Sequence, residues 1–420
     1  MKSVLTRAKN LVGVRKILVL MTGVVFVLSI LRVITGASDL TSIGTASAAL
    51  LLSVPIVLAA LGGLFSERAG VVNIGLEGMM ILGAWGGGFF GVKFGPWAGL
   101  AGSIFCGLLG AGIHALATIT FGVDHVVSGV AINIIAAGLA RYLSTILYKG
   151  GSWLGPSQSP DVKTISLNGL PVLSGGEFFG WKSPDLLTKL GSKNWFLISD
   201  FANVLRGLTG DLSYVTLFAI LLVPISYFIL WRTAFGLRLR SAGEAPVAAE
   251  SLGVNVYAMK YAGVLISGAL AGLGGGFLAL VASNHYQENQ TGGRGFIGLA
   301  AMLFGNWRPG GLLAGAGLFG FADALQLRDA SAIHALLLLI VLALLFLSFR
   351  DFRKSRRIPA VINLVIAGFF AWFFMTYKEL PGQLVTMTPY LATLIVLSMA
   401  SQKLRAPAAD GIPYRRGGLK

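Results

Sequence analysis

Long runs of apolar residues alternate with short polar segments along almost the whole chain. The runs occupy residues 17–36, 43–65, 71–92, 97–121, 126–148, 214–231, 260–282, 295–306, 311–326, 332–349, 359–376 and 384–400. Most approach or exceed the roughly 20 residues that a helix needs to cross the hydrocarbon core of a bilayer. Runs 295–306 and 311–326 are shorter, and they are expected to form either short spans or a re-entrant pair around Trp307. The pattern predicts an all-α integral membrane protein, a polytopic bundle of about 10 to 12 transmembrane or re-entrant helices.

Composition supports a membrane protein. The 420 residues are 55% hydrophobic and only 12% charged, whereas a soluble domain carries about 25% charged residues. The single cysteine, Cys106, lies inside an apolar run, so disulfides are not expected to contribute. No A-x-A cleavage site follows the first run, which is therefore interpreted as an uncleaved anchor.

The net charge of +16 is concentrated in four segments. These are the N-terminus 1–16, the start of the loop after residue 231, the short loop 350–357, and the tail 401–420. The positive-inside rule places all four in the cytoplasm, together with both termini, and the predicted spans alternate in agreement with this. No folded soluble module accompanies these basic segments, so we do not expect nucleic acid as a partner.

The same pattern divides the chain. We expect a basic cytoplasmic N-terminus 1–16, a first helix group 17–148, and an extracytoplasmic loop 149–212 with a short amphipathic helix around 185–207. A second helix group 213–349, extra helices in 350–400 and the basic tail 401–420 follow. Loops as long as 149–212 are usually either functional or disordered, and the sequence leaves that choice open.

Glycines recur at every fourth residue in two of the runs. They are Gly83, Gly87, Gly91, Gly95 and Gly99, and then Gly268, Gly272 and Gly276. This spacing leaves one helix face without side chains, so that a neighbouring backbone can approach closely. We therefore expect these glycines to pack helices together rather than to contact a substrate.

The stretch ERAGVVNIGLEGMM, residues 67–80, places polar groups between two strongly apolar runs. Its glycines permit a break in helical geometry, which the membrane tolerates only where protein or a water-filled cavity surrounds it. Glu67 and Arg68 are expected to be exposed at the cytoplasmic end. Asn73 and Glu77 are one helical turn apart, and they either line a pathway or tie neighbouring helices together. Asn133 lies in mid-span, needs a polar partner, and joins them as a candidate pathway residue.

The loop 233–259 contains the segment APVAAESLG, which predicts a short helix. Pro246 can open that helix and Gly253 can end it. A short cytoplasmic helix held between two spans would suit docking into a groove on a partner protein. An ordinary solvated loop is the alternative interpretation.

Several of these motifs resemble one family. Pro246, the triplet Ala248–Glu250 and Gly253 resemble the coupling-helix loop of bacterial ABC importer permeases. FSERAGVVNIGLEGMM, HVVSGVAINIIA and GRGFIGLAAMLFGNWRPGG resemble the branched-chain amino acid/simple-sugar permease superfamily, and within it the nucleoside importer branch that works with basic membrane lipoproteins. The resemblance implies two pseudo-symmetric half-bundles, with the 67–80 and 293–311 motifs at related positions. It also implies contact with an ATPase through Glu244, Pro246, Ala249, Glu250 and Gly253.

The resulting expectation is a permease subunit of an ATP-driven importer in the cell membrane. The resemblance implies a nucleoside substrate, a second and non-identical permease, cytoplasmic ATPase subunits and an extracytoplasmic binding lipoprotein. The chain has no GxxxxGK[ST] phosphate loop, so ATP hydrolysis is expected on a separate chain and the protein itself is not expected to be an enzyme. No His/Cys cluster suggests a metal, and no cofactor is expected.

Three alternatives remain open at this point. A permease of the same superfamily could carry simple sugars or branched-chain amino acids. A secondary transporter driven by protons or sodium would need intramembrane acids, for which Glu77 is a lone candidate. A membrane enzyme is disfavoured, because no nucleophile or acid–base constellation is apparent in the sequence.

Overall fold

A computed structural model describes residues 22–149, 155, 157–163, 165, 173–178, 181–210, 212–328, 330–377, 381–383, 387 and 404–416. Within this part of the chain, 7 helices are long and apolar enough to cross a membrane: Ile43–Arg68, Pro96–Thr120, His125–Leu147, Tyr214–Arg232, Val256–Ala282, Ser331–Arg353 and Arg357–Thr376. Thr22–Thr35 and Arg294–Phe304 are shorter apolar helices. The protein is therefore an all-α, multi-pass membrane protein, as the sequence predicts.

The elements follow the chain in this order: η1 (Ser38–Thr41), α2 (Ile43–Arg68), α3 (Leu76–Phe94), α4 (Pro96–Ala115), η2 (Leu116–Thr120), α5 (His125–Leu147), β1 (Glu177–Phe178), β2 (Trp181–Lys182), α6 (Leu186–Gly191), α7 (Ile198–Thr209), α8 (Tyr214–Arg232), α9 (Ala234–Glu244), α10 (Pro246–Ser251), α11 (Val256–Phe277), η3 (Leu278–Ala282), α12 (Arg294–Phe304), α13 (Pro309–Gln326), α14 (Ala330–Arg353) and α15 (Arg357–Thr376). Each predicted apolar run up to residue 376 contains a helix. The run 384–400, apart from residue 387, lies outside the described residues, as does the basic segment 1–16.

The chain forms two compact units. Unit 1 comprises Met1–Ala49, Asn168–Asp211 and Phe321–Pro389, and unit 2 comprises Leu50–Leu167, Leu212–Gly320 and Tyr390–Lys420. Two of the helices, α2 and α13, begin in one unit and end in the other. These boundaries differ from the linear helix groups that the sequence suggests, because each unit gathers segments far apart in the chain.

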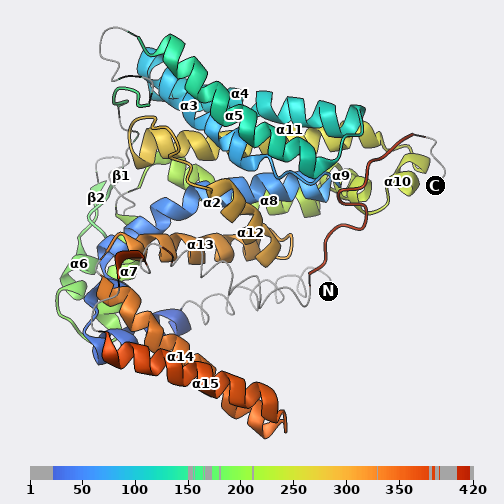
Figure 1. The fold of residues 1–420 in the computed structure, drawn as a ribbon. Helices are drawn as coiled ribbons and strands as arrows, with labels where there is room; N and C mark the ends of the chain where they lie inside the picture. The colour runs from blue at the N-terminus through green and yellow to red at the C-terminus, as the bar shows by residue number, and fades with distance from the viewer. Residues whose placement is uncertain are drawn as a thin grey trace, which may run out of the picture. The chain divides into compact units, whose positions relative to one another are not determined.

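Helices α3, α4 and α11 form the centre of unit 2, with α5 alongside (Figure 1). Their backbones approach so closely that a methyl group added at Gly83 would collide with the backbone of Gly272, and one added at Gly107 would collide with Gly268. Small residues permit this packing in a membrane, where van der Waals contact replaces the hydrophobic effect as the force between helices. The predicted packing role of the glycine repeats is confirmed at these positions. Gly95 instead ends α3 at a φ of 92°, with open space around it.

An aromatic cluster joins α3 to the end of α5 in unit 2. The rings of Trp85 and Phe89 stack with centroids 5.2 Å apart, and Tyr148 stacks against both. The indole Nε1 of Trp85 donates to Ser144 Oγ at 3.1 Å. The ring of Tyr286, from the segment after α11, meets Tyr148 edge-on. These contacts fix α3 and α5 against each other at the ends remote from the α2–α3 connection.

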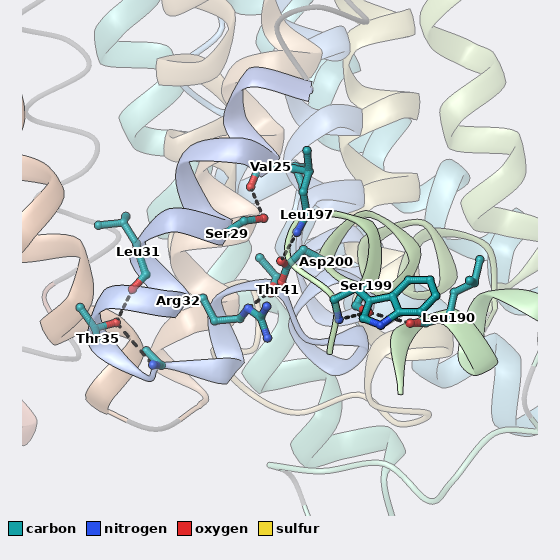
Figure 2. Close-up of polar contacts among 12 residues, drawn as sticks. Val25, Ser29, Leu31, Arg32, Thr35, Thr41, Leu190, Leu197, Ser199 and Asp200 are labelled. Carbon is teal, nitrogen blue, oxygen red and sulfur yellow. Dashed lines mark hydrogen bonds and ion pairs between the residues drawn. The ribbon is translucent and has the colours of Figure 1, made fainter. Parts of the chain in front are cut away.

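In unit 1, the amphipathic helix expected around 185–207 is present as two helices, α6 and α7. Helix α7 buries its polar side: the Asp200 carboxylate is 1% exposed and pairs with Arg32 Nε at 2.9 Å. Thr41 Oγ1 also donates a hydrogen bond to this carboxylate, and Figure 2 shows the three side chains converging. Ile198 and Phe201 on the same helix are exposed. Helix α7 therefore presents its apolar side outward, which is the arrangement expected beside lipid.

Helices α14 and α15 of unit 1 lie side by side as a hairpin (Figure 1). Ser348 Oγ donates to the carbonyl of Ala360 at 2.7 Å and joins the two helices. Only 11% of the apolar window of α15 is buried. An apolar helix that is exposed on most sides requires lipid around it, so we expect this hairpin to be surrounded mainly by lipid.

Candidate functional site

The connection between α2 and α3 is a break in regular structure. Helix α2 ends at Arg68 and α3 begins at Leu76, while Gly70 takes a φ of 81°. We call residues 69–75 the broken segment. The sequence predicts the break from its glycines, but it places Asn73 one helical turn before Glu77, and this is wrong. Asn73 belongs to the broken segment and Glu77 to the first turn of α3.

Side chains from surrounding helices satisfy the backbone of the broken segment. An unpaired peptide group costs several kcal/mol in the bilayer core, so this pairing is what permits an interruption inside a membrane protein. The bonds join Gly70 O to Lys260 Nζ (2.9 Å), Val71 O to Ser66 Oγ (2.6 Å), Val72 N to His125 Nδ1 (3.2 Å), Val72 O to His114 Nε2 (3.1 Å) and Ile74 O to Asn133 Nδ2 (3.1 Å). The two histidines are thus bonded at helix interfaces.

Asn133 on α5 holds the beginning of α3. Its Oδ1 accepts from Gly78 N at 2.7 Å, and its Nδ2 donates to Ile74 O at 3.1 Å. One amide therefore pairs with a free N–H of the first turn of α3 and with a carbonyl of the broken segment. The sequence requires a partner for Asn133, and the structure supplies two. Both are backbone groups, so this side chain ties helices together in the described conformation.

Asn73 is completely buried. Its Nδ2 donates to Ser267 Oγ on α11 at 2.9 Å. Its Oδ1 is also buried and has no hydrogen-bond partner among the described residues. A buried amide oxygen without a donor is costly, at about 1–3 kcal/mol. Asn73 therefore keeps one acceptor available for a hydroxyl or N–H donor that reaches the broken segment.

Glu77 joins α3 to α12. Its Oε1 accepts from Gly293 N at 3.0 Å, and its Oε2 accepts from Gly295 N at 2.7 Å. The carboxylate lies at the N-terminus of α12, where free N–H groups and the helix dipole favour a negative charge. The side chain is only 7% exposed. Of the two roles open from the sequence, these contacts match the tie between neighbouring helices, and they bring the 67–80 and 293–311 motifs together.

Glu67 and Arg68 are not the exposed pair that the sequence suggests, and this prediction is wrong. Glu67 is 5% exposed, and its Oε2 accepts from Trp307 Nε1 at 2.6 Å. Arg68 donates from Nη2 to the Trp307 carbonyl at 2.9 Å. Trp307 is the turn between α12 and α13, at a φ of 52°. The partner is distant in sequence, so local pattern gives no sign that the end of α2 is covered.

Part of the C-terminal tail also reaches this cluster. The carboxyl of Asp410 lies close to the carboxyl of Glu67. Burial is the main cause that raises the pKa of Asp410 to about 7, while Lys260 and Arg68 oppose the rise. The backbone of the tail is bound as well, because Ala409 N donates to Gly243 O at 2.9 Å.

The predicted docking loop contains two helices, α9 and α10. Pro246 is the first residue of α10, and Gly253 follows its end at a φ of 81°, so both predicted boundary residues are confirmed. Ala249 is buried against Ala242 and Val256. Glu244 pairs with Arg68 at 3.6 Å and accepts from Ala408 N at 3.2 Å. The longer helix α9 is not predicted from the sequence.

Helix α10 has two different sides. Glu250 faces the tail, where Tyr414 OH donates to Oε2 and Arg416 Nε lies 2.9 Å from Oε1. Val247 is 62% exposed and Leu252, directly after the helix, is 85% exposed. The free apolar side chains can enter a groove on a partner, whereas Glu250 is bound within the chain.

Within the described residues, no group of three or more His, Cys, Asp or Glu side chains is arranged to hold a metal ion. Side chains of the surrounding helices instead bond to the backbone of the broken segment, while Asn73 Oδ1 has no partner among the described residues. Beside this segment, Ser128 Oγ lies 2.9 Å from His114 Nδ1, and both side chains are buried.

Comparisons with known proteins identify the chain's relatives. The family of permease components of branched-chain amino acid transport systems matches residues 45–349. The guanosine ABC transporter permease protein NupQ of Bacillus subtilis is 36% identical over 88% of this chain and 96% of its own length. The nucleoside ABC transporter permease protein NupC of Lactococcus lactis is 33% identical over 87% and 94%. A putative glucose ABC transporter permease protein, TsgC13 of Haloferax volcanii, is 31% identical over 86% and 94%. No solved structure matches the chain.

Proposed function

Because the chain belongs to the family of permease components of branched-chain amino acid transport systems, we propose that it is the membrane-spanning subunit of an ATP-driven importer of nucleosides. The substrate assignment rests on similarity over nearly the full length to two permeases named for guanosine and nucleosides. The helical membrane fold and the interrupted segment at its centre support the transport role.

The partners follow from the same premise. The importer includes ATPase subunits in the cytoplasm, and the exposed side of α10 is the part of this chain that docks on them. A second permease completes the pathway: Lactococcus lactis has two nucleoside permease proteins, NupC and NupB, that are both similar to this chain. A substrate-binding lipoprotein on the other side of the cell membrane delivers the nucleoside. In this orientation both termini and the loop 233–259 are cytoplasmic, as the basic residues there favour.

The broken segment is the proposed moving part of the pathway. A nucleoside is neutral and carries ribose hydroxyls, which pair with amide and carboxylate oxygens. The buried, unpaired Oδ1 of Asn73 is the acceptor that we propose binds such a hydroxyl once movement of the broken segment uncovers it. Asn133 and Glu77 bind backbone groups at the first turns of α3 and α12. Movement of either helix would therefore break these hydrogen bonds and let the two side chains form new ones. Alternating exposure of a site at interrupted helices is a general scheme for membrane transport.

The contacts of Glu77 bear on the ion-coupled alternative. A proton- or sodium-driven transporter needs an intramembrane acid that binds and releases the ion. Both carboxylate oxygens of Glu77 accept backbone N–H groups. This is the environment of a helix cap, and it supports the ATP-driven class.

Uptake of radiolabelled guanosine in cells that carry the complete system tests both the class and the substrate. We expect uptake to stop when the phosphate-loop lysine of the ATPase is replaced, with the membrane potential intact. Unlabelled adenosine should compete, whereas leucine and glucose should not. Uptake that survives the ATPase variant and collapses with a protonophore would overturn the ABC class. Uptake of glucose or leucine that excess nucleoside does not reduce would overturn the nucleoside assignment but not the ABC class.

A further inference from the structure

The tail residues 404–416 connect two parts of unit 2 that the proposed function requires to move together. Resting on that function, we propose that this segment is a strap through which displacement of the docking helix α10 is passed to the broken segment 69–75. Tyr414 and Asp410 act as positioning residues at the two ends of the strap.

One end of the strap is fixed to α10. Tyr414 OH donates to the Glu250 carboxylate, and its ring lies 5.5 Å from that of Tyr257 at the start of α11. Tyr257 OH donates in turn to the backbone carbonyl of Tyr414 at 3.4 Å. Arg416 adds an ion pair to Glu250, but its side chain is 80% exposed, so this pair is expected to contribute little. The part-buried Tyr414, through its ring contact and its hydroxyl bond, is the principal attachment.

The other end of the strap is fixed to the broken segment. Ala409 N is bonded to Gly243 O, and Gly243 packs directly against the backbone of Arg68 and Gly70. The carboxyl of Asp410 lies close to that of Glu67 at the end of α2. Gly411 lies against the Val72 side chain. The strap therefore contacts both the start and the middle of the interruption.

The strap also closes a ring of contacts with α9. Glu244, the last residue of α9, binds Ala408 N of the strap and Arg68 of α2. Farther along, Arg405 N donates to Asn306 Oδ1 in the α12–α13 turn at 2.9 Å. A solvated tail would not contact five separate elements, namely α2, α9, α10, α11 and the α12–α13 turn. A contiguous network of this kind can carry coupling between two sites. Coupling is demonstrated when both ends respond to the same change.

The experiment compares Tyr414→Phe and Glu250→Gln with Arg416→Ala, all in the complete transporter in proteoliposomes. Tyr414→Phe keeps the ring but removes the hydroxyl bond. We expect a transporter that assembles normally, with unchanged basal ATP hydrolysis and a loss of about tenfold in substrate-stimulated hydrolysis, the size of one hydrogen bond to a charged group. Glu250→Gln keeps one acceptor oxygen but removes the charge, so it should lose a smaller factor. The double variant should lose no more than Tyr414→Phe alone, because the hydroxyl bond is already absent in that variant. Arg416→Ala should resemble the natural protein.

Three results would overturn the strap. They are unchanged stimulation in both Tyr414→Phe and Glu250→Gln, losses that multiply in the double variant, or loss of ATPase association in Tyr414→Phe. The last would place Tyr414 in the docking contact itself. Val247→Arg separates this inference from the proposed function, because it changes the exposed side of α10. If Val247→Arg leaves ATPase association intact, the docking assignment fails. If Val247→Arg abolishes association while Tyr414→Phe has no effect, only the strap fails.

Discussion

Replacing Glu77 with glutamine tests whether this carboxylate ties helices together or serves the substrate. Glutamine keeps the shape and one acceptor oxygen, but its NH2 group would face one of the two backbone N–H groups that the carboxylate now accepts. One charge-assisted hydrogen bond is lost, at about 1.5–3 kcal/mol. The charge at the N-terminus of α12 is lost as well, at about 0.3–2 kcal/mol. We expect the free energy of unfolding to fall by about 2–5 kcal/mol in total.

The assay is denaturation of the purified protein in mixed micelles with increasing sodium dodecyl sulfate, beside uptake measured per folded molecule. Glu288→Gln is the matched control. Its carboxylate pairs with Arg141, whose side chain is 70% exposed, so the control should cost at most about 1 kcal/mol. If Glu77→Gln leaves the free energy of unfolding unchanged but abolishes uptake, Glu77 contacts the substrate and the reasoning is refuted.

Two further predictions concern helix packing and the strap. Gly83→Ala should prevent stable assembly of α3 against α11, measured as loss of folded protein in the membrane. Gly138→Ala, with open space around it, should keep or raise stability by about 0.5–1 kcal/mol, and equal behaviour of the two would contradict the packing argument. Because burial raises the pKa of Asp410 from 3.8 to about 7, strap docking is strongest at low pH and weakens as pH rises to about 7, beyond which the loss is complete. The measurement uses a spin label at Ile412→Cys in a Cys106→Ser background. The ratio of mobile to docked label should rise about tenfold between pH 6 and pH 8. This rise should vanish in Asp410→Asn.

Local pattern predicts the elements but not their long-range partners. The apolar runs give the helices, because spanning a bilayer fixes length and composition together. Pro246 and Gly253 give the ends of α10, because proline and glycine act on their own backbone. Glu67 shows the limit. Its burial depends on Trp307 and Asp410, and the sequence near residue 67 does not predict a contact with either of them.

The same limit applies to the candidate site. Asn133, Glu77 and Asn73 stand out because polar groups in apolar runs need partners, but periodicity cannot show which partners they find. The three bind the backbone of α3, the N-terminus of α12 and Ser267 respectively. The strap is hidden for the opposite reason. Its basic residues are typical of a solvated tail, whereas its contacts other than the exposed Arg416–Glu250 pair are made by one tyrosine, one aspartate and several backbone groups.

The pairing of the broken segment also bears on how well the membrane stays sealed. A gap in a helix normally needs water to hydrate its free peptide groups, and a column of water conducts protons. Here His114, His125, Lys260 and Asn133 take the place of that water. The four backbone groups that they bind therefore need no water in this conformation. A cell can keep such a protein in its membrane without dissipating its ion gradients, and a variant that loses these side chains should make the membrane leaky before it makes the transporter slow.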